Sequence, residues 1–291
     1  MLIINAVGGS VNIMNYGFFL IFFEWFCNQR KKNLSVYYRK QIFFAEQLFI
    51  KKLMKTIKQL LFFTVLLFAA TSCFEDFTIR GNGIAASQGR TVSSFNKVKS
   101  AGDFEVHITK GDVSEVVINA EENLIPYIET SVSGNTLLID IPGWHNVKHQ
   151  LPIKIYVTVP TLESVKQSGS GNITTGFFES EKFELFISGS GSITSAVNAN
   201  SIMAGISGSG WMKISGDANQ SDLSISGSGN IDSYNLAVEN CVAHISGSGD
   251  VKVNAANSIV AKISGSGSIY YIGNPEIETN ISGSGKVIPV H

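Results

Sequence analysis

The sequence predicts an all-β protein, a single-stranded parallel β-helix (a solenoid) with 18–20 residues in each coil. Consecutive copies of the tetrapeptide Ser-Gly-Ser-Gly are 18–20 residues apart, and its seven copies begin at Ser168, Ser188, Ser207, Ser226, Ser246, Ser264 and Ser282. Apolar and mixed positions alternate around every copy. The 291 residues include 28 Gly and only 15% charged residues, a composition typical of an ordered β protein with many tight bends.

The alternation around the tetrapeptide indicates which face of each strand is buried. Ile precedes six of the seven copies, and Gln167 precedes the first. Mostly apolar residues recur two and four residues before that Ile and six residues after it. A period of two is typical of a strand with one buried face, and residues that recur in every coil are expected to stack about 4.8 Å apart. Both Gly residues fall on the inward parity, where they leave room for a narrow bend and permit unusual backbone angles.

Residues 54–73 have the three parts of a bacterial signal peptide. Lys55 and Lys58 supply positive charge, residues 60–70 form an apolar run too short to span a bilayer comfortably, and small residues lead up to Cys73. The segment resembles the lipobox of bacterial lipoproteins, in which the cysteine thiol receives a diacylglycerol. We therefore predict that Cys73 is lipidated and that the membrane is a partner through this anchor. An ordinary secretory signal and an uncleaved anchor are the alternatives.

Residues 1–53 do not fit that arrangement, because a signal peptide works at the start of a chain. We interpret them as a misassigned upstream extension, with Met54 as the first residue; a genuine N-terminal extension or extra anchor is the alternative. Glu75 and Asp76 follow the cysteine closely, and acidic residues there resemble the surface-export signal of Bacteroidetes lipoproteins. The predicted location is the cell envelope, as an outer-membrane lipoprotein, with surface display as a further hypothesis.

The rest of the chain divides into three parts. Residues 74–90 are predicted to be a linker. Residues 91–160 lack the tetrapeptide but alternate as strands do, for example over 104–108 and 153–159. We expect irregular solenoid coils there that cap the stack, because a solenoid must hide the open edge and core at its end; a separate small β-domain is the alternative. Residues 161–291 form the regular Ser-Gly-Ser-Gly solenoid.

Several short segments resemble a known family. Residues 95–98 are Phe-Asn-Lys-Val, 102–106 are Gly-Asp-Phe-Glu-Val, 110–112 are Lys-Gly-Asp and 121–124 are Glu-Glu-Asn-Leu, followed by serial Ser-Gly-Ser-Gly motifs. Over about residues 91–289 the chain resembles the auto-transporter adhesin family with a head GIN domain, which is common among Bacteroidetes lipoproteins. The resemblance implies a right-handed β-helix and a cell-surface, adhesive role. It supplies no catalytic residues to carry over.

Charge and cysteine content limit the classes of partner and cross-link. Thirteen Lys and Arg against twenty-one Asp and Glu follow Cys73, a net charge of −8, so no nucleic-acid partner is expected. The three cysteines, Cys27, Cys73 and Cys241, offer no disulfide framework. Cys241 falls on an inward strand position, where a buried free thiol is expected.

No catalytic residue, metal site or cofactor is predicted. His145 and His149 have the spacing of a helical metal pair, but they follow a Pro-Gly turn and lack the accompanying Glu. A calcium ladder would need an Asp after every tetrapeptide, and one copy of seven has it. Glu184, Asp222 and Glu278 share the outward strand face, but they lie in different coils and are predicted to be solvated side chains.

Five apolar residues on outward positions form the candidate contact surface: Phe186, Met203, Trp211, Val242 and Val260. Exposed apolar stripes often mark contacts. The stripe is interpreted first as a protein contact or a homo-oligomer interface. A sugar-stacking face and a strip covered by another segment of the chain are the alternatives.

The predicted function is structural or adhesive. A lipid-anchored solenoid in the cell envelope would bind a protein or polysaccharide ligand through a broad repetitive surface, without catalysis. The alternative is a glycan-active enzyme, a β-helix of the polysaccharide lyase or hydrolase type, which needs convergent carboxylates in a groove.

Overall fold

The computed structural model describes residues 53, 54, 57, 78–143 and 146–290. The chain divides into two compact units, Met1–Glu75 and Asp76–His291. In the first unit residues 53, 54 and 57 are described, and they are helical. The predicted upstream extension, the signal peptide and the lipidation site at Cys73 otherwise lie outside the described residues. None of the described helical residues belongs to a helix long and apolar enough to cross a membrane.

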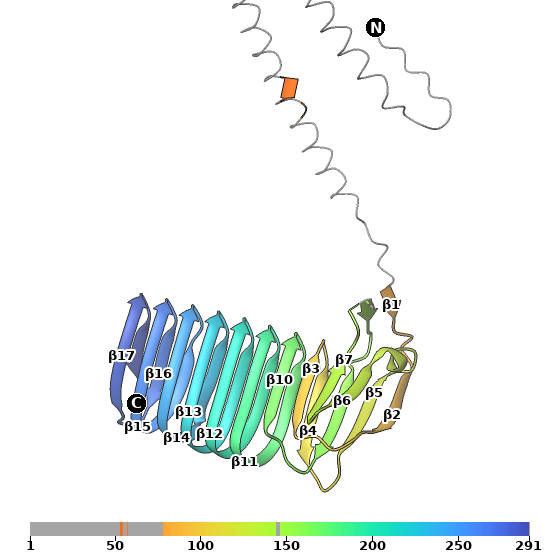
Figure 1. Ribbon diagram of the computed structural model, residues 1–291, viewed down its shortest axis with the longest axis horizontal. Helices are drawn as coiled ribbons and strands as arrows, with labels where there is room; N and C mark the ends of the chain where they lie inside the picture. The colour runs from red at the N-terminus through yellow and green to blue at the C-terminus, as the bar shows by residue number, and fades with distance from the viewer. Residues whose placement is uncertain (1–52, 55–56, 58–77, 144–145, 291) are drawn as a thin grey trace, which may run out of the picture. The chain divides into compact units, whose positions relative to one another are not determined.

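The described residues of the second unit form strands and one short 3-10 helix (Figure 1). The first half contains β1 (Thr78–Arg80), β2 (Ala85–Thr91), β3 (Lys97–Ala101), β4 (Glu105–Lys110), β5 (Glu115–Glu121), η2 (Ile125–Tyr127), β6 (Glu129–Ser133), β7 (Thr136–Asp140), β8 (Asn146–Lys148) and β9 (Lys154–Val159). The second half contains β10 (Ser164–Gly169), β11 (Asn172–Gly189), β12 (Ser192–Gly208), β13 (Trp211–Gly227), β14 (Asn230–Gly247), β15 (Val251–Gly265), β16 (Ser268–Ile272), β17 (Glu276–Gly283) and β18 (Lys286–Pro289).

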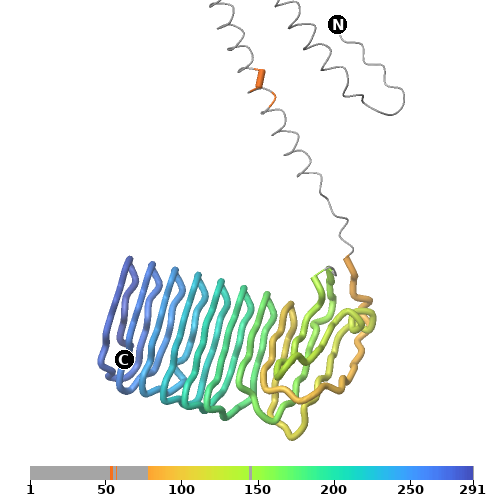
Figure 2. The backbone as a smooth tube through the Cα atoms, in the orientation of Figure 1, coloured from red at the N-terminus to blue at the C-terminus, as the bar shows by residue number. Residues whose placement is uncertain are grey.

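The predicted parallel β-solenoid is confirmed. Strands β10 to β15 lie side by side in chain order, each pairing in parallel with the next, and β16, β17 and β18 complete the last coils (Figures 1 and 2). The seven tetrapeptides form one column, in which Ser168 pairs with Ser188 and the register continues without a break to Ser282. About seven turns stack in this way.

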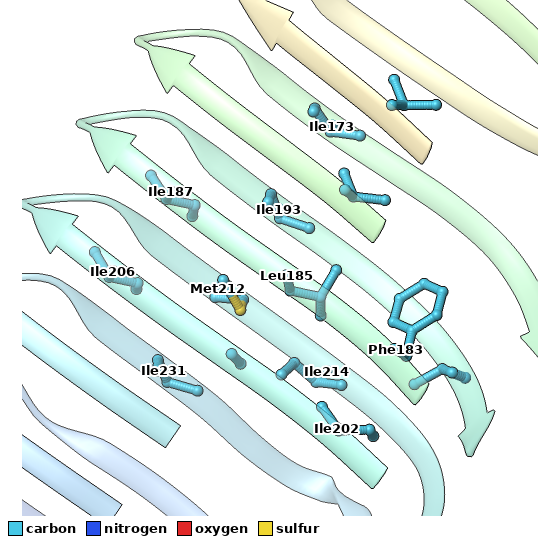
Figure 3. Packing of buried hydrophobic residues seen from close by; sticks show 14 of the residues in the cluster. Ile173, Phe183, Leu185, Ile187, Ile193, Ile202, Ile206, Met212, Ile214 and Ile231 are labelled. Atoms are coloured by element: carbon cyan, nitrogen blue, oxygen red, sulfur yellow. The ribbon is translucent and has the colours of Figure 1, made fainter. Parts of the chain in front are cut away.

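The predicted inward residues make the core of the stack (Figure 3). Ile187 and Ile206, which precede successive tetrapeptides, are 2% and 3% exposed. Across the coil, Ile193 and Met212 are fully buried. Burying each such side chain contributes about 1.5–3 kcal/mol, so every added coil adds a similar layer of apolar contacts.

The first Gly of the tetrapeptide makes the tight corner of each coil. Gly208 has a φ of 126°, a conformation that side chains with a Cβ rarely adopt. A Cβ on Gly208 would also lie 2.4 Å from the carbonyl oxygen of Gly189 in the preceding coil. The corner therefore needs Gly both for its backbone angles and for the close approach of successive coils, as the inward parity predicts.

The N-terminal part of this unit extends the core but departs from the regular stack. Beyond β10 the parallel order continues through β3 and β7, and beyond β11 it continues through β4 and β9. Antiparallel strands come next, where β6 pairs with β7, and β5 pairs with both β9 and β2. Phe104, Leu137 and Ile155 are at most 1% exposed and belong to the same apolar cluster as the stack.

The predicted linker 74–90 is wrong for most of the residues that the structure describes. β1 pairs in parallel with β8, and β2 pairs antiparallel with β5 over its full length. The sequence of β2, Ala-Ala-Ser-Gln-Gly-Arg-Thr, has no apolar alternation and so carries no strand signal. Arg90 helps to fix this strand, because its Nη1 donates to the carbonyl oxygen of Ile128 at 2.6 Å and to Thr130 Oγ1 at 3.0 Å.

The buried carboxylate of Glu121 holds the loop between β1 and β2 in place through hydrogen bonds. Glu121 accepts hydrogen bonds from the backbone N–H groups of Gly83 at 2.6 Å, Gln150 at 2.8 Å and Leu151 at 3.3 Å. Burial raises the pKa of Glu121, but these hydrogen bonds and the nearby His149 outweigh it and hold the pKa below its ordinary value. The ionised carboxylate therefore joins three segments of the irregular half.

Candidate binding groove

A groove runs along the stack beside the tight corner. One wall is the serine column, which is the first Ser of each of the seven tetrapeptides. The other wall is the outer column, two residues earlier in each coil, which consists of Lys99, Lys166, Phe186, Gly205, Ser224, His244, Lys262 and Asn280. The inward Ile residues between the two columns form the floor. The groove has a volume of about 760 Å³.

The outer column has its smallest members near the middle of the groove. Gly205 and Ser224 lie between Phe186 and His244. A Cβ on Gly205 would lie 2.8 Å from two ring carbons of Phe186, so the aromatic ring leans over Gly205 along the wall. Phe186 is therefore half-buried and presents an apolar face to the groove.

Basic side chains lie toward both ends of the outer column. Lys166 Nζ lies 5.2 Å from the centroid of the Phe186 ring and 3.7 Å from Glu184 Oε2. The ring and the carboxylate both attract the ammonium group and favour its placement beside the groove. Lys99 neighbours Lys166 in the column, and Lys262 lies four coils beyond Phe186.

The predicted contact surface is divided by the structure. Phe186 lies in the groove wall, whereas Met203, Val242 and Val260 lie in a parallel column two residues earlier in their coils. Asp222 interrupts that second column, because it pairs with Met203 on one side and Val242 on the other.

Trp211 does not join these four residues. It follows the tetrapeptide that starts at Ser207, so the tight corner separates it from them, and it pairs with Ser192 and Asn230. At 41% exposed it stays accessible. The contact role of all five residues stays a prediction, but they cannot act as one continuous stripe.

The three outward carboxylates also lie outside the groove lining. Glu184 and Asp222 have Met203 between them in their column, and Val242 and Val260 separate Asp222 from Glu278. The groove itself is lined by hydroxyl, amide, basic and apolar groups. It offers binding chemistry, with hydroxyl groups that both donate and accept hydrogen bonds.

The other candidate residues have structural partners. His149 Nδ1 lies 3.0 Å from the Leu151 carbonyl oxygen, and His149 Nε2 lies 3.4 Å from Asp103 Oδ2, while His145 lies outside the described residues. Within the described ranges no group of three His, Cys, Asp or Glu side chains could hold a metal ion. Cys241 is buried and free, as predicted, and burial raises the pKa of its thiol to about 11.

The groove was not predicted from the sequence, although its signal is present there. With a period of 18–20 residues, Phe186, Gly205 and Ser224 must be neighbours in successive coils. A large side chain followed by the two smallest outward residues indicates a local depression in a ladder. The signal is easily missed, because the column contains apolar, polar and charged members and its positions are therefore classed only as mixed.

Comparison with known proteins places the fold. The structure is similar to a putative adhesin from Bacteroides fragilis, with a TM-score of 0.68 and 24% identity over 73% of this chain and 100% of that one. A putative lipid binding protein from Parabacteroides distasonis has a TM-score of 0.63 and 23% identity, covering 74% of this chain and 100% of its own. A putative adhesin from Parabacteroides merdae has a TM-score of 0.62 and 23% identity, covering 74% and 99%. No curated protein matches.

These three likenesses show the fold alone, since the sequences have diverged. The family model is more specific, because it matches residues 94–275, which include β3 to β9 and most of the stack. Its description is putative auto-transporter adhesin, head GIN domain. The chain belongs to this adhesin family, as the resemblance of its repeats and of its N-terminal segments implies.

Proposed function

We propose that the protein is a lipid-anchored adhesin of the cell envelope whose groove binds an extended, anionic polysaccharide. The observation that carries the proposal is the continuity of the groove over eight neighbouring strands, each of which contributes one residue to the outer column. Seven steps of about 4.8 Å make the groove about 34 Å long. A site of that length suits a chain molecule better than a compact ligand.

The chemistry of the walls supports a sugar polymer. The serine column repeats a hydroxyl group in every coil, and hydroxyl groups pair with the hydroxyls of a sugar as donor or acceptor. Phe186, whose ring is half-buried in the outer column, gives apolar contact for the face of a sugar ring. Lys166 and Lys262, five coils apart in the outer column, attract acidic groups on the polymer.

The family and the N-terminal sequence support the proposed location. An adhesin-type family points to the cell surface or envelope. We further propose that acyl chains on Cys73 hold the protein in the outer membrane, since multiple acyl chains are a lasting anchor. Mass spectrometry of the purified membrane protein tests this, because a diacylglycerol on Cys73 is expected and an unmodified Cys73 would contradict it.

Two serine substitutions test the groove itself. The full-length chain is screened against neutral and acidic polysaccharides, and affinity for the best ligand is then measured by calorimetry. Ser207→Trp, in the serine column, should fill the groove and weaken binding by about tenfold or more. Ser209→Trp is the matched control, because Ser209 is also exposed, lies two residues away and does not line the groove.

Several outcomes would overturn the proposal. Equal affinity in the two variants would remove the groove as the binding site. Binding to extended peptides or to acyl chains, with none to polysaccharides, would assign a different ligand to the same groove. Affinity for the acidic polymers that did not fall with rising salt would contradict the role of Lys166 and Lys262.

A further inference from the structure

The apolar core is exposed at one end of the stack and covered at the other. In the last coil the inward positions are open, and Ile281 is 40% exposed, whereas its counterpart Ile263 one coil earlier is 2% exposed. Thr279 is exposed and Ile277 is half-buried in the same strand, while Ala261 and Ile259 beneath them are fully buried. The open end is formed by β17 and β18.

The backbone of the last coil is also open. β17 pairs with β15 and β18 pairs with β16, and among the described residues nothing pairs with their outer edges. An apolar strand edge of this kind is a template for pairing with another strand. The opposite end is closed, because antiparallel β5 and β6 follow the parallel strands and Ile125 and Ile128, at and beside η2, are buried in the core.

We infer that the open end is a self-association surface on which a second copy of this chain docks end to end. Inside the stack, every coil is covered by a coil of nearly the same outline in register. A second copy offers that outline at its own open end, so it covers the exposed core as a further coil would, but with the strand direction reversed. The symmetry of such a pair is two-fold, which requires the β17 edges to run antiparallel.

The sequence of β17 suits two-fold pairing about Thr279. In an antiparallel pair related by a two-fold axis, residues of the same parity face each other. A pair centred on Thr279 places the half-buried Ile277 opposite the partner's exposed Ile281, so the four Ile side chains of the pair cover one another. Glu276 and Glu278 then face Ser282 and Asn280 of the second copy, and no two carboxylates are directly opposed.

The size of the surface predicts a weak, reversible contact. The eight residues of β17 span about 26 Å and two packed layers are about 10 Å thick, so a pair buries on the order of 500 Å² in total. Stable dimers bury about 1,200 Å² or more. The chain enters the solenoid at the closed end, near β1 (Figure 1). If the anchor of the proposed function is correct, copies in facing membranes can therefore meet through their open ends.

A cysteine at the two-fold axis tests the contact. Thr279→Cys in the full-length chain places two thiols opposite each other across the antiparallel pair, at a Cα separation of about 4.5–5.5 Å that suits a disulfide. Mild oxidation should convert most of this variant into a disulfide dimer. The parent chain, with its native cysteines, and Ser226→Cys, an exposed position of an inner coil, should give no more dimer than background.

A second variant separates this inference from the proposed function. Ile281→Asp, combined with Thr279→Cys, places two new charges at the contact, one from each copy, and should reduce the disulfide dimer at least about tenfold while the circular dichroism of the stack stays unchanged. Ser207→Trp should leave the dimer unchanged, because the groove lies elsewhere. Equal cross-linking of Thr279→Cys and Ser226→Cys, or a dimer that resists Ile281→Asp, would overturn end-to-end docking whether or not the groove binds polysaccharide.

Discussion

The regular stack, from β10 to β18, and the irregular half, from β1 to β9, share one core but are held together differently. In the stack each contact recurs in every coil, as the column of inward Ile residues shows. In the irregular half the main polar contacts occur once, as with Arg90 and Glu121. The comparison indicates that the stack depends on backbone and packing geometry that every coil repeats. The irregular half depends on polar contacts that each occur once.

The largest effect is expected where a repeated corner is blocked. Gly208→Val puts a β-branched side chain at a φ of 126° and against the carbonyl oxygen of Gly189, which should destabilise the protein by about 4 kcal/mol. Gly89→Val in β2 is the control, since a Cβ there meets nothing within 4 Å, and it should change stability by less than about 0.5 kcal/mol. Urea denaturation of both variants measures the difference, and equal losses would contradict it.

Isoleucine substitutions sharpen the comparison within the stack. Ile225→Ala removes a side chain that is 2% exposed between two coils and should cost about 3 kcal/mol. Ile281→Ala makes the same change in the open coil, where the residue is already 40% exposed, and should cost less than about 1 kcal/mol. Similar costs at the two sites, again by denaturant midpoint, would show that the last coil is covered in the isolated chain.

The same contrast explains how far the sequence predicts the structure. In the stack, neighbours in space are one period apart in sequence, so alternation and spacing suffice to place Ile187 beneath Ile206. β2 could not be predicted, because its partner β5 is an unrelated segment and its own residues lack apolar alternation. The separation of Trp211 from Met203 depends on the direction in which the Gly-Ser corner turns the chain, which residue parity does not contain.

A change of pH tests the hydrogen bonds that the Glu121 carboxylate accepts. Its pKa is lowered in the folded state, so the ionised carboxylate stabilises the protein above its ordinary pKa of about 4.3, and this contribution is lost as the pH falls through the folded value. Glu121→Gln should be less stable than the parent at pH 7, and the gap should narrow on acidification below about pH 4. Ile225→Ala provides the comparison, because its gap should not narrow. A constant gap for Glu121→Gln in thermal melts between pH 7 and pH 3 would show that the carboxylate charge is not what holds the loop.

A small effect on stability is expected on the groove wall. Lys166 and Glu184 are both partly exposed, so their ion pair and the contact of Lys166 with Phe186 contribute little, and Lys166→Ala should change the unfolding free energy by less than about 1 kcal/mol. Its effect on function should be larger, since the ammonium group attracts an acidic polymer. Lys213→Ala is the matched control, because Lys213 follows Trp211 beyond the tight corner and does not line the groove. Polysaccharide affinity should fall for Lys166→Ala and become less sensitive to salt, and should stay unchanged for Lys213→Ala. Equal polysaccharide affinities in the two variants would mean that the charge of Lys166 does not contribute to binding in the groove.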